Sequence, residues 1–186
     1  MLSQSDIEAA AGYAGRAQVG GQSQVRSGQD RQQQLATDQL VGQLGELALS
    51  KYLGGTRLFY ELTRTIRDLD PHAGDGGGDL LATNVDVKCS LMRAANNPLA
   101  YRLLVRPRER HPNTVYVLAL VEPDVWQTGK VCLVGWCKDT HLPKQPLAEG
   151  PFAGAHVVLA TELRPLPPIE FQWLFNFREL TCRTPG

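Results

Sequence analysis

Two aspartates and a lysine stand close together in the segment GDLLATNVDVKCS, residues 78–90. A tight two-residue turn at 83–84 would fold this segment into a hairpin in which Asp79 pairs with Lys88. Side chains alternate between the two faces of a strand, and directly opposed residues lie about 5 Å apart at Cβ. One face of the predicted hairpin therefore gathers four polar residues beside a glycine-rich loop: Asp79, Asp86, Lys88 and Ser90.

This polar face predicts metal-assisted hydrolysis of a phosphodiester. Two carboxylates at such a separation can share a hard cation, Mg²⁺ or Mn²⁺, which prefers oxygen ligands and removes the repulsion between them. The cation would polarise the phosphodiester and lower the pKa of a bound water. Lys88 would orient that water or stabilise charge in the transition state. As an auxiliary group, Ser90 would hold a metal-bound water or a phosphate oxygen.

A helix predicted over residues 31–53 would supply a third acid, Glu46. This helix ends at Gly54-Gly55, a typical C-terminal stop. On a helical wheel, Glu46 stands where a second apolar patch meets a polar edge, so we expect the helix to be buried on more than one side. The first apolar face comprises Leu40, Val41, Leu44, Leu47 and Ala48, the second patch Gly42, Leu49 and Leu53, and the polar edge Gln39, Gln43 and Ser50.

The rest of the sequence predicts an α/β domain with a mixed central sheet flanked by helices. Continuous apolar, β-branched runs such as VYVLALV and KVCLVGWC indicate buried strands. We expect strands at 57–63, 79–82, 85–90, 101–105, 115–121 and 130–137, a short strand within 156–166, and further helices at 4–11 and 168–178. The segment 138–156 is expected to be irregular because it carries three prolines.

These residues and their order resemble the PD-(D/E)xK nuclease superfamily, which has a restriction-endonuclease-like core. The likeness rests on Asp79, on Asp86-Val87-Lys88 a short strand later, and on Glu46 in the preceding helix, and it covers roughly residues 40–137. The sequence departs from the family pattern in having Gly78 where proline is common and a short spacing between the two aspartates. The resemblance implies a metal site formed by Asp79, Asp86, Glu46 and the backbone carbonyl of Val87, with Lys88 assisting the attacking water. Glu61 is a rival for Glu46, and Asp75 is a rival for Asp79.

Composition narrows the function classes. Nineteen basic and nineteen acidic residues give a formal net charge of zero, which excludes a histone-like binder but leaves room for a local basic surface. Four cysteines without a C-x-x-C pair and four histidines without H-x-x-x-H spacing argue against zinc. Without a secretory signal or an apolar run near the roughly 20 residues of a membrane span, we expect a cytoplasmic protein. A basic run follows the predicted strand at 101–105 and is either a DNA backbone contact or a solvated loop: Arg102, Arg106, Arg108, Arg110 and His111.

The leading hypothesis is a Mg²⁺- or Mn²⁺-dependent deoxyribonuclease that acts on DNA, as a homodimer or within a larger complex, and comes from a phage or mobile element. Its predicted organisation is an N-terminal helix with a flexible Gly- and Gln-rich segment at 1–30, a nuclease core at 31–137, and a C-terminal elaboration packing on that core at 138–186. Three alternatives stay open. The chain could be a non-catalytic nucleic-acid-binding or assembly module of the same fold. It could be an unrelated α/β protein that binds a partner through the Pro-rich region 138–168. The Asp–Lys pair could also be an exposed ion pair on a solvated strand face, which contributes little.

Overall fold

The computed structural model describes residues 1–19, 30–53, 84–93 and 97–166. Several predictions made from the sequence fall outside these ranges. They are the strands at 57–63 and 79–82, the turn at 83–84, the helix at 168–178, and the residues Glu61, Asp75 and Asp79.

Two long helices begin the chain. α1 spans Gln4–Val19 and α2 spans Asp30–Tyr52, which confirms the predicted helix at 31–53. α1 is longer than the predicted helix at 4–11, and it takes up the first part of the segment that was predicted to be flexible. The buried Ala10 and Ala14 give a physical reason, because they extend the apolar side of α1 past the glycine at which the prediction stopped.

A buried ion pair joins the two helices. The Lys51 Nζ of α2 lies 2.7 Å from Asp6 Oδ2 of α1, and the Asp6 side chain is only 6% exposed. Asp6 also caps its own helix, because the Ser3 backbone N–H donates to Asp6 Oδ2 while the Asp6 backbone N–H donates to Ser3 Oγ. Burial alone would raise the pKa of Asp6, but the contacts with Lys51 and Ser3 outweigh it and lower that pKa.

The described strands form two sheets. β1 (Val85–Leu91), β3 (Val115–Val121) and β4 (Val131–Lys138) make a mixed sheet of order β1-β3-β4, with β1 parallel and β4 antiparallel to β3. β2 (Arg102–Val105) and β5 (His156–Leu159) pair antiparallel in a separate sheet. The predicted strands at 85–90, 101–105, 115–121 and 130–137 and within 156–166 are therefore confirmed. Short helical segments connect the strands: Pro98–Ala100 (η1), Pro107–Glu109 (η2), Val125–Thr128 (α4), Asp139–His141 (η3) and Ala160–Glu162 (η4).

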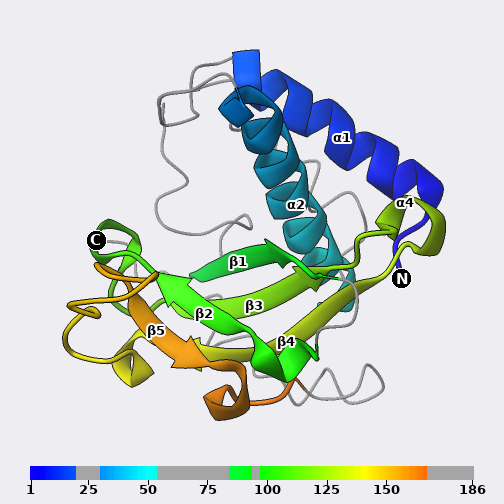
Figure 1. Ribbon diagram of the computed structural model, residues 1–186. Coiled ribbons are helices and arrows are strands. Elements are labelled where there is room, and N and C mark those ends of the chain that lie inside the picture. The colour runs from blue at the N-terminus through cyan, green and yellow to red at the C-terminus, as the bar shows by residue number, and fades with distance from the viewer. Residues whose placement is uncertain (20–29, 54–83, 94–96, 167–186) are drawn as a thin grey trace, which may run out of the picture.

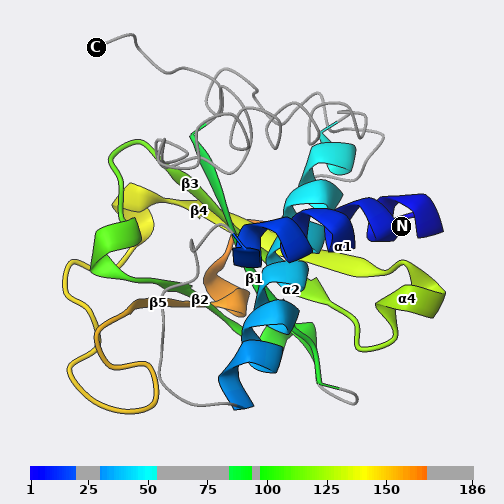
Figure 2. The ribbon, with the colours of Figure 1, turned by 90° about the horizontal axis from the view of Figure 1, so that it is seen from above.

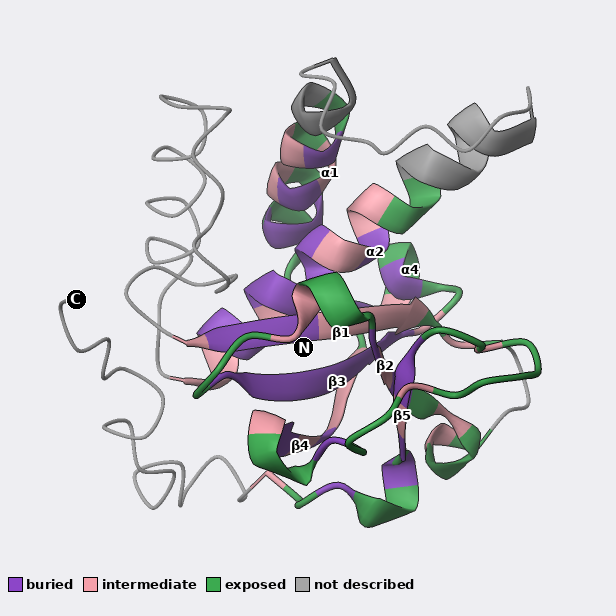
Figure 3. Cartoon of the chain, turned by 90° about the vertical axis from the view of Figure 1, so that its left-hand side faces the viewer, coloured by how far each residue is buried: buried purple, intermediate pink, exposed green. Residues whose placement is uncertain are grey.

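The two faces of the mixed sheet are covered differently (Figure 1). α1 and α2 cross on one side of it, as the view from above shows (Figure 2), while the β2–β5 sheet covers the other. Alternate residues of β3, which is buried along its whole length (purple in Figure 3), divide between the two cores. On the α2 side lie Val115, Val117 and Ala119 with Leu49, and on the β2–β5 side lie Tyr116, Leu118 and Leu120 with Leu103, Val105 and Val158.

The predicted mixed α/β architecture is thus confirmed, with the two long helices on one face of the sheet. Gly45 lets α2 approach β1 closely, because a Cβ at this position would collide with Cys89 Sγ; the same sulfur lies 3.7 Å from the Gly42 carbonyl oxygen. No helix within the described residues has an apolar stretch long enough to cross a lipid bilayer.

Candidate active site

β1 presents Asp86 and Lys88 on one face. In its parallel register with β3, Asp86 stands beside Tyr116 and Lys88 beside Leu118, two residues of the core on the β2–β5 side. Val87 and its alternating neighbours turn the other way and pack beneath α2. The strand therefore carries its polar pair away from the helices and towards the second sheet. Ser90, the predicted auxiliary residue, follows on the same strand and is half-buried.

A second carboxylate that the sequence did not indicate completes this polar cluster. Lys88 Nζ lies 2.9 Å from Asp86 Oδ2 and 3.2 Å from Glu109 Oε2. The three side chains are 12% (Asp86), 22% (Lys88) and 29% (Glu109) exposed. Because these side chains are mostly buried, solvent screens the Lys88 ammonium only partly. The Asp86–Lys88 pair is therefore not the exposed ion pair on a solvated strand face that was considered as an alternative.

The buried Tyr116 holds Glu109 in place. Its hydroxyl donates to the Glu109 carbonyl oxygen and accepts from the His111 backbone N–H, both at 2.9 Å. Tyr116 is fully buried on β3, so the η2 turn is anchored directly to the central strand. Burial raises the pKa of the Tyr116 hydroxyl, and the negative charge of Asp86 acts in the same direction. The hydroxyl therefore stays protonated and can donate.

Glu109 is surrounded by cations. Besides Lys88, Arg106 Nη1 and Arg108 Nε each lie 4.0 Å from Glu109 Oε1, and the Arg106 backbone N–H donates to Glu109 Oε2. Burial alone would raise the pKa of Glu109, but Lys88 and Arg106 outweigh it and lower that pKa. The group is therefore ionised at neutral pH. The only sign of it in the sequence was an acid within the basic run RPRER.

The arginines of the basic run have different surroundings. Arg110 donates to the Pro143 carbonyl oxygen at 3.1 Å and to the Asp139 carbonyl oxygen at 3.3 Å, so it joins two segments of backbone. Arg110 therefore has a structural role, and its contact with DNA stays a prediction. Arg106 and Arg108 are about half exposed, and the Arg102 guanidinium lies 5.4 Å from the centre of the Phe152 ring.

Glu46, the predicted helical acid, lies on α2 and is 7% exposed. α2 packs against the face of β1 opposite to Asp86, so a carboxylate on α2 reaches the Asp86 side only past the edge of β1. Among the described strands β1 is an edge strand. The assignment of Glu46 to the site stays a prediction. Its neighbours Gln43 and Ser50 are also buried, so the polar edge of α2 does not face solvent.

The donor chemistry at Asp86 and Glu109 fits a hard divalent cation. Both offer carboxylate oxygens, which Mg²⁺ and Mn²⁺ prefer, and both contact the Lys88 ammonium, which compensates their charge. The Val87 carbonyl oxygen, another predicted ligand, lies 3.9 Å from Cys89 Sγ. Within the described part of the chain, no three His, Cys, Asp or Glu side chains are grouped closely enough to hold a metal. Asp79 falls outside that part.

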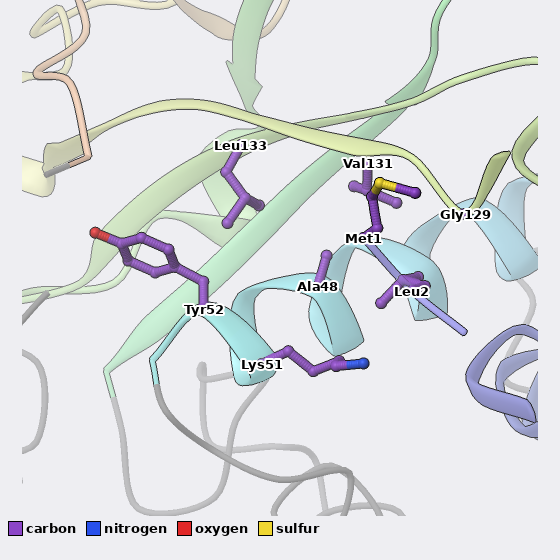
Figure 4. A pocket seen from close by; sticks show the side chains of 8 residues that line it. All are labelled: Met1, Leu2, Ala48, Lys51, Tyr52, Gly129, Val131 and Leu133. Carbon is purple, nitrogen blue, oxygen red and sulfur yellow. The ribbon is translucent and has the colours of Figure 1, made fainter. Parts of the chain in front are cut away.

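Two hollows lie on opposite sides of the mixed sheet. One, of about 690 Å³, opens beside Lys88 and is lined by Leu104 and by residues 106–109 and 151–155. The other, of about 360 Å³, lies between the end of α2 and β4 and contains none of the candidate catalytic residues (Figure 4). Its lining is mostly apolar apart from Lys51 and Tyr52, and burial raises the pKa of Tyr52. The hollow beside Lys88 is therefore the one related to the candidate site.

Comparisons of the chain with family models, with curated proteins and with solved structures find no match. The functional argument therefore depends on the Asp86–Lys88–Glu109 geometry and on the motif in the sequence.

Proposed function

We propose that this protein is a metal-dependent nuclease of the PD-(D/E)xK type that hydrolyses DNA phosphodiester bonds. The observation that carries the proposal is the half-buried contact between Asp86 and Lys88, which stand two residues apart on one strand, with Lys88 lining a hollow bordered by arginines. An Asp-x-Lys pair so placed provides a metal-binding oxygen and a fixed positive charge at one point. Those two groups are what phosphodiester hydrolysis requires.

In the proposed mechanism, a bound Mg²⁺ or Mn²⁺ would supply Lewis acidity and a lower pKa for the attacking water. Asp86 would supply a carboxylate ligand to this metal. Lys88 holds its ammonium where negative charge develops on the phosphoryl oxygens, and it orients the water. Glu109 is a positioning residue, because it provides a second carboxylate contact that holds the Lys88 ammonium in place. Asp79 and Glu46 are the proposed further acids.

The test is a cleavage assay with the purified full chain on linear, circular and branched DNA, with Mg²⁺, with Mn²⁺ and with EDTA. We expect cleavage only with the metals, and a loss of at least about a hundredfold in Asp86→Ala and in Lys88→Ala. Lys130→Ala is the matched control, because Lys130 forms another Lys–acid contact, 3.9 Å from Glu122, and is 55% exposed. Cleavage that survives EDTA, or that Lys88→Ala and Lys130→Ala affect equally, would refute this mechanism.

One observation favours a second candidate, a non-catalytic nucleic-acid-binding module of the same fold. Lys88 already contacts both nearby carboxylates, and the described residues contain no group of three metal-binding side chains. Salt-sensitive DNA binding without metal-dependent cleavage, unchanged in Asp86→Ala, would support this candidate over the nuclease.

A further inference from the structure

The hollow beside Lys88 has the size of a ligand site and two distinct walls. Its volume of about 690 Å³ lies within the range of roughly 300–1,000 Å³ that is typical of such sites. One wall is the η2 turn at 106–109, and the other is the turn at 151–155, which precedes β5. Lys88 lines the same hollow, so whatever occupies it approaches the candidate active site.

The first wall is cationic. Lys88, Arg106 and Arg108 all lie within 4.0 Å of the carboxylate of Glu109, and Lys88 also contacts Asp86, so three cations face two carboxylates and one net positive charge is left. The two arginine contacts are loose, and these side chains are 46% and 51% exposed. Such contacts contribute little to stability, so the guanidinium groups can turn to an incoming phosphate at small cost.

The second wall offers an aromatic ring. Phe152 lines the hollow and is half-buried, with the Arg102 guanidinium 5.4 Å from its ring centre. The loop is closed by its own backbone, because the Leu147 N–H donates to the Ala155 carbonyl and the Gly154 N–H donates to the Leu147 carbonyl. Cations along a groove with an aromatic side chain are the composition of sites that hold single-stranded nucleic acid.

We propose that this hollow holds an unpaired nucleotide of a DNA single strand, with its phosphates at Arg106 and Arg108 and its base against Phe152. The inference rests on the proposed function, because it requires the bound DNA strand to reach Lys88 of the candidate active site. A base within a duplex is stacked between its neighbours and must leave the stack before it can lie on a protein aromatic ring. The site therefore selects single-stranded DNA or frayed ends over intact duplex.

The test measures binding by fluorescence anisotropy with the full chain in EDTA, using a labelled oligodeoxythymidine, the same oligonucleotide with abasic positions, and a duplex of equal length. We expect tighter binding to the single strand than to the duplex. Abasic positions and Phe152→Leu should each weaken single-strand binding by about 5- to 100-fold, whereas Phe152→Trp should retain it. Arg106→Gln should weaken binding and reduce its dependence on salt by about one unit of slope.

Trp126→Leu is the matched control, because Trp126 is an exposed aromatic residue, at 43%, on α4 at the far side of the molecule from β5 (Figure 1). Equal affinity for single strand and duplex, or single-strand binding that abasic positions leave unchanged, would overturn the assignment of the hollow. The measurement with abasic DNA uses the unmodified protein, so it tests the nucleotide site even if Phe152→Leu does not fold.

The outcome is separable from that of the nuclease proposal because the binding assay contains no available metal. If the protein binds abasic DNA more weakly but never cleaves DNA, the nuclease proposal is wrong and the nucleotide site stands. If the protein cleaves DNA with Mg²⁺ but binds abasic DNA with unchanged affinity, the nuclease proposal stands and the nucleotide site is wrong.

Discussion

Substituting two glycines of α2 by alanine tests how this helix lies over β1. In a helix interior, Gly→Ala stabilises by about 1 kcal/mol, because glycine loses more backbone freedom on folding. A Cβ at Gly42 meets nothing within 4 Å, so Gly42→Ala should show this gain. A Cβ at Gly45 would collide with Cys89 Sγ and lie 3.3 Å from the Ala119 Cβ. Overpacking of this kind costs about 1–3 kcal/mol, so Gly45→Ala should be less stable than Gly42→Ala by about that amount.

The assay is equilibrium unfolding in urea, with free energies extrapolated to water. Combining Gly45→Ala with Cys89→Ala removes the sulfur, and the double-mutant cycle should show a favourable coupling of at least about 1 kcal/mol. Equal stabilities for the two single variants, or no coupling in the cycle, would refute the close approach of α2 to β1. They would also remove the reason for placing the helix of Glu46 on the face of β1 opposite to Asp86.

Three further predictions concern single contacts. Lys51→Met should cost about 1–3 kcal/mol at pH 7 by urea unfolding. Because the folded protein lowers the pKa of Asp6 below its ordinary 3.8, this contribution is present above that value, and the gap from the unmodified protein should close as the pH falls through the folded pKa. Tyr116→Phe should cost about 1–3 kcal/mol and, by releasing the backbone of Glu109, lower DNA cleavage, whereas unchanged stability would contradict the anchoring role. Gly129→Ala should lower the thermal midpoint, because position 129 has φ +63° and its Cβ would collide with backbone; the expected cost is at least about 1–3 kcal/mol.

Most helices and strands of the fold could be predicted from local sequence patterns. The apolar, β-branched runs of β3 and β4 identify buried strands without any tertiary information. α1 was predicted too short because the Gly- and Gln-rich composition that follows residue 11 indicated a flexible segment, whereas the burial of Ala14 shows that the helix continues. The pairing of β2 with β5 could not be predicted, because each strand has four residues and nothing local specifies its partner.

The residues of the candidate site also differ in whether the sequence could predict them. Alternation along one strand is enough to put Asp86 and Lys88 on a common face. Glu109 was missed because its place beside Lys88 depends on the parallel pairing of β1 with β3 and on the hydroxyl of Tyr116. The strand pairing joins segments that are distant in the sequence, and the bond from Tyr116 to Glu109, although it spans only seven residues, depends on Tyr116 being buried on β3. For the same reason the structural role of Arg110 could not be predicted from the basic run.

The pairing of β2 with β5 has a consequence for the order of folding. Val105 pairs with His156, so the two walls of the hollow meet only after nearly the whole described chain has been made. Closing so long a loop is slow compared with forming the helices. On the ribosome, β1 and β3 can therefore pair before the wall that bears Phe152 exists, and the hollow is among the last parts of the described structure to be assembled.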